Sequence, residues 1–330
     1  MTELAPKVVQ VTGRDVEAAA RRLAPHMSPT PLVYSPALSD LLGAEIWLKL
    51  ETASEIASFK LRGALNALMS VENPGSALTS STGNHGQGVA LAARRLGIPA
   101  DIFVPVDPNP VKVRMIELLG GRVHVGGHDI DAAKERAYAH QAKHGGTFVD
   151  DGENAHLIAG AGTVGLEIGK GLEDIDVLYV PMGSGSLASG TATGIKAVQP
   201  NVRVVAVQAA GAPAMVESFL ARRAVERPIA TRADCLVCRI PAAQALSTLI
   251  AAVDDALLVT DAEMLAAVHT YLARAHLLIE LGSAAPLVGA WKEREMIRGK
   301  RVVLVVSGAN AVPEIVAEAL RTPPLGGAFA

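Results

Sequence analysis

The sequence is poor in aromatic residues, in cysteine and in excess positive charge. Its 330 residues include five Phe, four Tyr and two Trp, against 31 Gly. Two Cys are too few for a disulfide framework and are typical of a reducing compartment, so we expect a cytoplasmic protein. Lys and Arg number 30 against 33 Asp and Glu, which argues against a nucleic-acid partner. Many glycines and few rings favour a site that grips its ligand with backbone N–H groups.

Long apolar runs are also absent. The longest stretches, such as residues 204–216, are interrupted by Gln, Gly and Pro, and none reaches the roughly 20 residues that span a bilayer. We therefore expect no membrane partner. The chain is nevertheless 50% hydrophobic and 19% charged, which suits a large core, and its length suits two domains.

Short β-branched runs alternate with Ala- and Leu-rich segments of helical period along the chain. Strands are predicted at residues 44–50, 77–80, 100–104, 122–125, 147–149, 177–180, 202–207 and 302–306. Helices are predicted at 16–23, 59–69, 85–96, 111–119, 130–143, 163–169, 187–198, 213–221, 261–275 and 314–320. Uninterrupted apolar runs indicate parallel strands buried on both faces. The alternation predicts an α/β fold with twisted, mostly parallel sheets flanked by helices.

Two turn signals, Pro74–Gly75 and Gly145–Gly146, mark predicted hinges. They bracket four of the strand patterns. We therefore predict a small inserted domain, residues 75–147, and a large domain made of residues 1–74 and 148–330. Ligands of open parallel sheets bind beyond the carboxyl ends of strands. Three Gly- and Ser-rich segments fall at such places: Ser80–Gly88, Met182–Gly190 and Ser307–Asn310.

The segment Met182–Gly190 follows a predicted strand and opens a helix. Glycines let the backbone approach an anion, and the free N–H groups and the helix dipole favour a phosphate. The dinucleotide pattern G-x-G-x-x-G/A is met by Gly183, Gly185 and Ala188, but Gln208 stands where an acidic ribose partner is needed. A single phosphate is therefore favoured, and a nucleotide-dependent oxidoreductase is a distant alternative.

Lys60 begins a predicted helix. A helix N-terminus disfavours a cation and so favours the unprotonated, nucleophilic amine. A lysine, a single-phosphate loop and a site at a sheet edge together suggest pyridoxal phosphate held as a Schiff base. Taken alone, Lys60 also fits a solvated surface lysine, and a non-enzymatic binding protein would not need it.

Four segments together resemble the serine/threonine dehydratase family, the fold-type II pyridoxal phosphate enzymes that include serine racemase. They are Ser58–Ala64, Ser81–Gly88, Gly183–Leu187 and Ser307–Asn310, and their order and spacing match over nearly the whole chain. The resemblance implies a two-domain fold like that of the tryptophan synthase β chain, pyridoxal 5'-phosphate as cofactor, an amino-acid substrate and a homodimer.

The resemblance also implies roles for single residues. Lys60 would bind the cofactor covalently and remove the substrate α-proton, with Thr82 as a second catalytic residue. The implied cofactor-binding residues are Phe59, Lys60, Asn84, Gly183, Ser184, Gly185, Ser186, Leu187 and Ser307. The implied substrate-binding residues are Ser81, Thr82, Asn84 and His85.

The implied reaction is β-elimination by a dehydratase (ammonia-lyase). A β-hydroxy-α-amino acid, namely serine, threonine or a bulkier analogue such as phenylserine or hydroxyaspartate, would give a 2-oxo acid and ammonia. The neutral hydroxyl of Ser307 opposite the pyridine nitrogen favours elimination. An amino-acid racemase is the alternative, because Thr82 keeps the hydroxyl of the serine that acts as second acid–base group in serine racemase.

The chain departs from the family at several positions. The usual Pro-Thr-Gly before the lysine motif is Glu55-Ile56-Ala57 here, and Glu55 is either a surface residue or a contact to the distal part of the substrate. Glu280 is expected at a strand end behind the site, as an indirect contributor only. Cys235 replaces a usual glycine near the cofactor, and Cys235 and Cys238 are expected as reduced thiols, in preference to a zinc or redox site.

No divalent metal is predicted. The positions that could supply ligands after the strand at 202–207 are Gln208, Ala212 and Ala214, which offer no carboxylate. A monovalent ion on backbone carbonyls stays open. His140 and His144 lie four apart on a predicted helix, and a solvated surface is favoured over a metal pair there.

Overall fold

The structure, a computed structural model, describes residues 8–327, so the ends of the predicted large domain lie outside it. The strands are β1 (Leu32–Tyr34), β2 (Glu45–Leu50), β3 (Ala77–Ser80), β4 (Ala100–Val104), β5 (Gly121–Val125), β6 (Thr147–Phe148), β7 (Val177–Pro181), β8 (Arg203–Ala209), β9 (Asp255–Val259) and β10 (Arg301–Val306). The α-helices are α1 (Gly13–Leu23), α2 (Pro36–Leu42), α3 (Lys60–Met69), α4 (Asn84–Arg95), α5 (Pro110–Leu118), α6 (Ile130–His144), α7 (Ala155–Gly171), α8 (Ser186–Lys196), α9 (Ala214–Ala221), α10 (Ala243–Ala252), α11 (Asp261–Thr270), α12 (Ala285–Lys292) and α13 (Pro313–Ala319). Short turns of other helix types are η1 (Glu51–Ala53), η2 (Asp234–Leu236), η3 (Tyr271–Ala275) and η4 (Leu281–Ala284).

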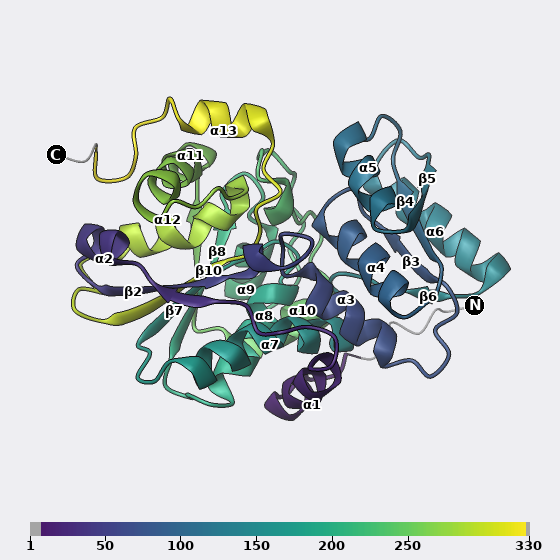
Figure 1. The fold of residues 1–330 in the computed structure, drawn as a ribbon, viewed down its shortest axis with the longest axis horizontal. Helices are drawn as coiled ribbons and strands as arrows, with labels where there is room; N and C mark the ends of the chain where they lie inside the picture. Colours follow the sequence, from purple (N-terminus) through teal and green to yellow (C-terminus); the bar gives the residue numbers. More distant parts are fainter. Residues whose placement is uncertain (1–7, 328–330) are drawn as a thin grey trace.

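The strands form two sheets (Figure 1). The large sheet has six strands in the order β1-β2-β10-β7-β8-β9, and the small sheet has four in the order β5-β4-β3-β6. The pairing of β1 with β2 is antiparallel, and the other pairings are parallel. This arrangement confirms the predicted α/β fold with mostly parallel sheets.

Helices cover both faces of each sheet. Along β10, Val302 and Leu304 pack with α2, α11 and α12, whereas Val303 packs on the opposite face with α7–α10. In the small sheet, Ile102 packs with α4 and α5 and its neighbour Phe103 packs with α6. Burial on both faces explains why these strands are continuous apolar runs.

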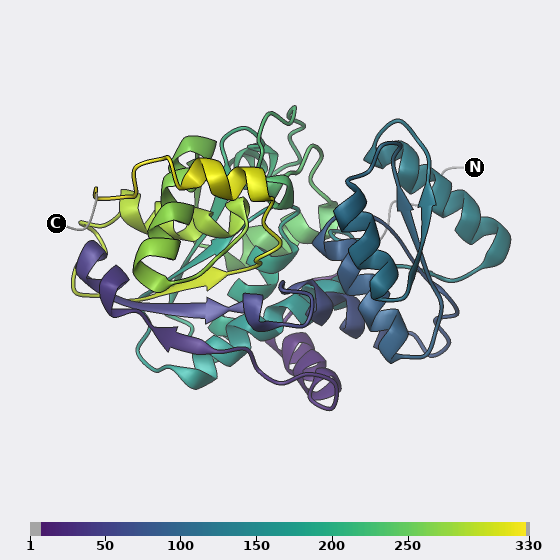
Figure 2. The same ribbon diagram turned by 45° about the horizontal axis from the view of Figure 1, so that its top comes forward.

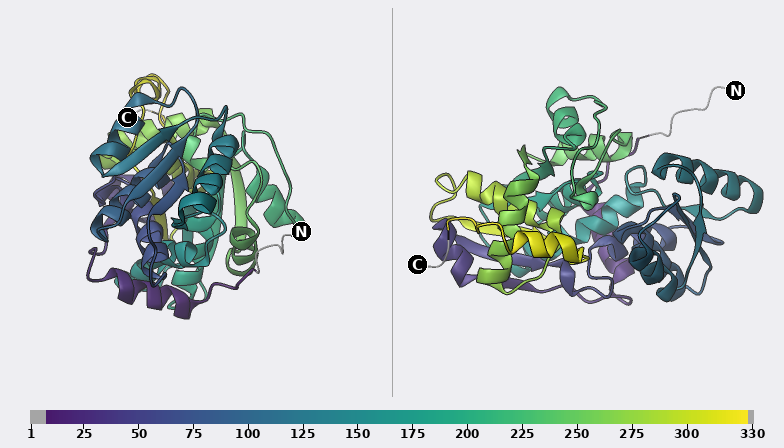
Figure 3. Two further views of the ribbon diagram at one scale, coloured as in Figure 1. Left: turned by 90° about the vertical axis from the view of Figure 1, so that its right-hand side faces the viewer. Right: turned by 90° about the horizontal axis from the view of Figure 1, so that it is seen from above.

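The two sheets lie one after the other along the long axis of the molecule, with α3 and α4 between them (Figures 1 and 2). Seen from above, the small sheet and its helices form one end, and α13 covers the part built on the large sheet (Figure 3). None of the described helices is long and apolar enough to cross a membrane.

Several elements differ from the sequence predictions. The edge strands β1 and β9 and the helices α2, α10 and α12 were not predicted. The edge strand β1 has three residues and no buried side chain, so it carries no apolar run. Half of the residues of α10 and most of those of α12 are buried, and both helices lack the polar stripe that marks an amphipathic helix. The run 277–280, predicted to end a strand, belongs to no strand.

The helix α7 is much longer than the predicted segment 163–169. Its glycines lower the helix propensity that the prediction relied on. They are needed for packing, because a Cβ at Gly165 would lie 2.0 Å from the carbonyl oxygen of Thr191 in α8. A Cβ at Gly194 in α8 would lie 2.1 Å from the carbonyl oxygen of Gly162 in α7. The two helices therefore touch backbone to backbone, which overrides local propensity.

Candidate functional site

The carboxyl ends of strands from both sheets lead to one cavity of about 690 Å³, a size typical of small-ligand sites. β3 leads into Ser81, β6 into Asp151, β7 into the loop before α8, and β10 into the segment from Ser307. Among the predicted site residues, Lys60, Ser81, Thr82, Asn84, His85 and Ser184 line the cavity. Phe59, Gly183, Gly185, Ser186, Leu187 and Ser307 are not part of its lining.

Lys60 is held at the first turn of α3 by a contact with the segment after β10. Ser58 and Gly308, far apart in the sequence, form an antiparallel β-bridge. The Lys60 side chain, 13% exposed, lies in the cavity with Nζ 2.5 Å from the Asp151 carboxylate. Nζ also lies 4.9 Å from the centre of the Phe59 ring. The fold therefore presents the amine to the cavity, so Lys60 is not a solvated surface lysine.

Asn84 begins α4 with its side-chain amide held on two sides. Its Nδ2 donates to both carboxylate oxygens of Glu280, at 2.8 and 3.0 Å, and its Oδ1 accepts from Asn310 Nδ2 at 2.6 Å. One turn later, a Cβ at Gly88 would lie 2.9 Å from the carbonyl carbon of Lys60. Glycine at this position lets α4 approach the start of α3, where Lys60 lies.

The loop from β7 into α8 has the geometry of an anion site. Gly185 has a φ of +93°, and a Cβ at Gly183 would lie 2.6 Å from a backbone carbonyl oxygen, so both positions require glycine. The first amides of α8 have no acceptor within the helix, and the helix dipole favours an anion. The hydroxyls of Ser184 and Ser186 donate to Asp151 at 2.9 and 3.3 Å.

Ser307 is buried, and its side-chain hydroxyl contacts the hydroxyl of another serine. Its Oγ lies 2.9 Å from Oγ of Ser283. Ser283 Oγ also donates to the carbonyl of Gly308 and accepts from its N–H, both at 2.8 Å. This network fixes the serine segment with neutral groups.

The predicted substrate-binding residues lie at the start of α4. Ser81 Oγ accepts from the Gly83 N–H at 3.2 Å. His85 is buried, and its Nε2 lies 2.9 Å from the carbonyl oxygen of Val149, to which it donates. Burial, which outweighs the nearby Asp151 carboxylate, lowers the pKa of His85, so the ring is neutral at neutral pH. Its Nδ1 has no hydrogen-bond partner among the described residues.

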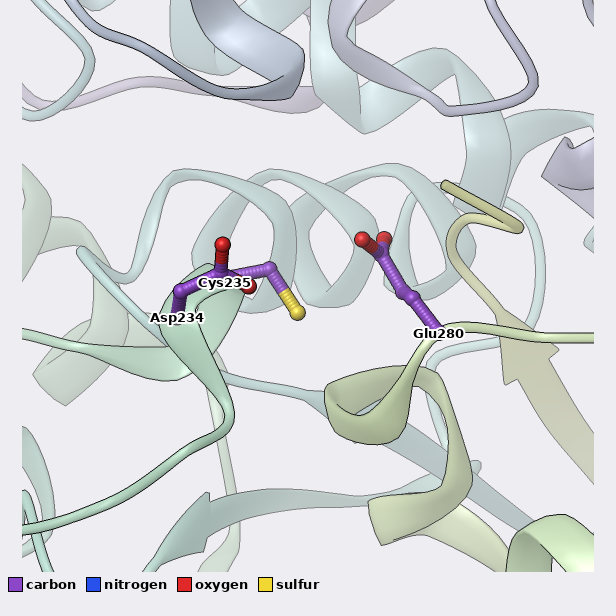
Figure 4. Close-up of side chains that lie close together, drawn as sticks. All are labelled: Asp234, Cys235 and Glu280. Carbon is purple, nitrogen blue, oxygen red and sulfur yellow. The ribbon is translucent and has the colours of Figure 1, made fainter. Parts of the chain in front are cut away.

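Glu280 lines the cavity directly, which corrects the prediction of a strand-end residue behind the site. Its carboxylate, the thiol of Cys235 and the carboxylate of Asp234 lie within 4.8 Å of one another (Figure 4). Within residues 8–327 this is the one group of three close potential metal ligands, and His140 and His144 belong to no such group. Burial raises the pKa of the Cys235 thiol far above its usual value, so it is not the thiolate that metals bind.

Burial raises the pKa of Glu280 to about 7, against an ordinary 4.5, despite the hydrogen bond from Asn84. Between these values the unfolded chain loses the proton while the folded protein keeps it, so the wild type loses stability as the pH rises. Glu280→Gln has no such proton. We therefore expect the free energy of unfolding of Glu280→Gln, relative to that of the wild type, to rise by up to about 3 kcal/mol from about pH 4.5 to pH 8. Urea denaturation of both proteins at the two pH values measures this change. A difference in stability between variant and wild type that does not change with pH would contradict the prediction.

The segment before the lysine motif shows whether Glu55 is a surface residue or a contact of the site. The Glu55 side chain is 62% exposed, pairs with Arg95 and is not part of the cavity lining, so it is a surface residue. Ala57, which stands at the usual glycine position of the family, has a φ of +50°. This left-handed conformation costs a non-glycine residue roughly 1–2 kcal/mol.

We therefore expect Ala57→Gly to stabilise the protein by about 1 kcal/mol. Urea unfolding of the variant measures the change. The matched control is Ala67→Gly inside α3, where the same substitution is expected to cost about 0.5–1 kcal/mol. Equal destabilisation by both substitutions would show that Ala57 is unstrained.

The two cysteines lie in different surroundings. Cys235 lines the cavity and packs with the core cluster that contains α11 and α12. Cys238 belongs to the cluster on the other face of the large sheet. Both are free thiols, and burial raises the pKa of Cys238 to about 12. These surroundings fit reduced thiols, and Cys235 alone lines the cavity.

The chain resembles known proteins in family, sequence and fold. A family model described as pyridoxal-phosphate dependent enzyme matches residues 23–308. The L-threonine ammonia-lyase of Thermotoga maritima is 37% identical over 306 residues, which cover 91% of this chain and 76% of that protein. The processed threonine deaminase isoform 2 of Solanum lycopersicum superposes with a TM-score of 0.88 at 27% identity, covering 99% of both chains. Maize serine racemase superposes with a TM-score of 0.88 at 26% identity, covering 96% of this chain and 98% of its own.

The residues around the cavity fit pyridoxal phosphate. The amine of Lys60 is presented to the cavity, and the glycine-dependent loop before α8 offers backbone N–H groups to a phosphate. The oriented amide of Asn84 and the neutral hydroxyl of Ser307 supply groups for the polar atoms of the ring.

Proposed function

The chain belongs to the pyridoxal-phosphate-dependent enzyme family and is a lyase of the threonine dehydratase type, and we propose that its substrate is a small β-hydroxy-α-amino acid. The product would be a 2-oxo acid with release of ammonia. The observation that carries this proposal is the position of Lys60, whose amine lies in a cavity between a loop built for an anion and the oriented amide of Asn84.

Threonine and serine are the first candidates for the substrate. The curated relatives are named L-threonine ammonia-lyase and threonine dehydratase, and a superposable fungal enzyme is named L-serine ammonia-lyase. Bulkier analogues such as phenylserine and hydroxyaspartate are the second candidates. Exposed apolar residues of α5, Val111 and Met115, line the cavity and supply contacts for a larger apolar side chain.

We assign the binding roles to residues that follow strands or begin helices. The backbone N–H groups of Gly183, Ser184, Gly185, Ser186 and Leu187 would hold the cofactor phosphate. Asn84 would donate to the ring oxygen, Ser307 would face the ring nitrogen, and Phe59 would pack beside the ring. The substrate carboxylate would lie against Ser81, Thr82, Asn84 and His85 at the N-terminus of α4, where the helix dipole favours an anion.

The cofactor, when bound, supplies an electron sink that acidifies the substrate α-proton. Lys60 would act as the base that takes this proton, because its side chain lines the cavity. Ser307 would offer a neutral hydroxyl to the ring nitrogen, which would favour loss of the β-hydroxyl from the substrate. Thr82 lines the same cavity and would supply the second hydroxyl of the site.

A panel assay tests the proposal. The purified protein, loaded with pyridoxal phosphate, is incubated with L-threonine, L-serine, phenylserine, hydroxyaspartate and alanine, and the 2-oxo acid and ammonia are measured together. We expect equal amounts of both from at least one β-hydroxy amino acid and none from alanine. Formation of the D-isomer without 2-oxo acid would instead establish the racemase alternative.

We also propose that the protein acts in the cytoplasm as a homodimer. The free thiols support a reducing compartment, and the resemblance to dimeric family members supports the assembly. Sedimentation of the purified protein at micromolar concentration tests the dimer, and a monomer at that concentration would contradict it.

A further inference from the structure

Asp151 is an acidic residue at the reacting end of Lys60 that lies outside the four motif segments. It follows β6 and lines the same cavity. One carboxylate oxygen accepts from Lys60 Nζ at 2.5 Å and from Ser184 Oγ at 2.9 Å. The other lies 3.3 Å from Ser186 Oγ and 3.8 Å from Nδ1 of His85. The side chain therefore joins the reactive amine to the anion-binding loop.

Lys60 is the cation that this carboxylate faces. His85, on α4, is neutral for the reason given above. The adjacent carboxylate of Asp150 is directed elsewhere, to Lys134 at 2.5 Å. The thiol of Cys238, on the large-sheet side, stays protonated. Any change in the charge of the Lys60 nitrogen therefore acts directly on Asp151.

We propose that Asp151 is a further catalytic residue of the elimination, one whose carboxylate stabilises the proton that Lys60 takes from the substrate. The proposal rests on the function proposed above. A carboxylate within 2.5 Å of Nζ favours the ammonium form over the free amine. Proton removal from the substrate creates that ammonium, so the carboxylate lowers the energy of the product of this step.

The step balances in protons and electrons. The α-proton moves to Lys60 Nζ, and the electron pair of the broken C–H bond forms the Cα=Cβ bond as the C–O bond breaks. The departing hydroxyl takes a proton from the Lys60 ammonium and leaves as water, which restores the neutral amine beside Asp151. Burial opposes ionisation of Asp151, but the charge of Lys60 and the hydrogen bonds from Lys60 and Ser184 outweigh it and lower the pKa of Asp151, so the carboxyl group is an anion at neutral pH.

The first experiment measures the amine without catalysis. The full-length, cofactor-free protein is treated with trinitrobenzenesulfonate, which reacts with unprotonated amines, and labelling of Lys60 is followed by peptide mass. We expect Asp151→Asn to label severalfold faster than the wild type at pH 8, because the variant lacks the carboxylate that pairs with Nζ at 2.5 Å. Asp131→Asn, which removes a carboxylate from the exposed Arg239–Asp131 pair, is the matched control and should label at the wild-type rate. Labelling of Asp151→Asn at the wild-type rate would overturn the proposal.

The second experiment measures turnover of the loaded enzyme with its best substrate. We expect kcat of Asp151→Asn to fall about 10²-fold while KM changes little, because the lost interaction acts on the proton-transfer step. A kcat within threefold of the wild type would overturn the proposal. If no β-hydroxy amino acid gives a 2-oxo acid with the wild type, the proposed function fails, and the labelling experiment still decides whether Asp151 controls Lys60.

Folding of each variant is checked by thermal melting. Should Asp151→Asn fail to fold, Asp151→Glu takes its place, because it keeps the charge but moves the carboxylate by one methylene. Labelling of Lys60 as slow as in the wild type, together with a kcat at least about tenfold below that of the wild type, would support the proposal. Fast labelling, or a kcat equal to that of the wild type, would overturn it.

Discussion

Lys60→Ala is expected to lose 2-oxo acid formation by about 10³-fold or more, because it removes both the proposed attachment point of the cofactor and the proposed base of the elimination. The loss should appear in kcat, since the amine acts on the reacting atoms. The measurement is the initial rate of 2-oxo acid release at saturating substrate and cofactor. Visible absorbance of the protein after removal of free cofactor should vanish in parallel.

Two control variants separate the loss of the amine of Lys60 from the loss of a positive charge in the cavity. Lys60→Arg keeps a cation beside Asp151 but cannot bind the cofactor in the same way, so it should be as inactive as the alanine variant. Lys112 lines the same cavity and pairs with the exposed Asp234, and Lys112→Ala should stay within about threefold of the wild type, because exposed pairs contribute little. Comparable losses in Lys112→Ala and Lys60→Ala would contradict a specific role for Lys60.

Arg62→Ala is expected to lower the free energy of unfolding by about 3–5 kcal/mol, because it leaves the buried carboxylate of Glu51 without its charged partner. Arg62 is 1% exposed in α3, two residues after Lys60. It donates to Glu51 at 2.7 and 3.0 Å and to Glu167 at 2.5 and 2.9 Å. Glu51 is fully buried and keeps a single hydrogen bond, from Thr30 Oγ1, once Arg62 is removed.

The consequence extends to the site, because Arg62 anchors the first turn of α3 and so the position of Lys60. Urea denaturation gives the stability, and the cofactor absorbance gives the occupancy of the site. The matched control is Arg232→Ala, whose pair with Glu318 is exposed, so it should cost less than about 1 kcal/mol. Similar costs for the two variants would contradict the account of a buried charge network.

The motif residues could be predicted because short-range rules fix them. Glycine and serine after a parallel strand place a loop at the carboxyl end of the sheet, where the ends of β3, β7 and β10 meet. The close approaches at Gly88 and Gly183 explain why these glycines stand in the motifs. The convergence of Lys60 and Asn84 on one cavity followed from this edge rule together with the family resemblance.

Asp151 and Glu280 line the cavity, although the sequence patterns did not place either of them there. Asp150 and Asp151 directly follow the predicted strand at 147–149, so an acidic pair at a strand end was a usable signal for the site. The pair lies outside the four motif segments, so the family resemblance assigns it no role. Glu280 was misplaced because the apolar run before it suggested a strand, whereas the structure has an irregular segment there. Its contact with Asn84 joins segments far apart in the sequence, which no local pattern reports.

The central claim is that Lys60 carries the cofactor at the meeting point of the two sheets. Borohydride reduction of the loaded protein, followed by peptide mass mapping, tests it most directly, because reduction fixes pyridoxal phosphate to the amine that holds it. The account predicts one modified peptide, with the label on Lys60, and loss of 2-oxo acid formation in proportion to labelling. A label on another lysine such as Lys112, or full activity after complete reduction, would contradict it.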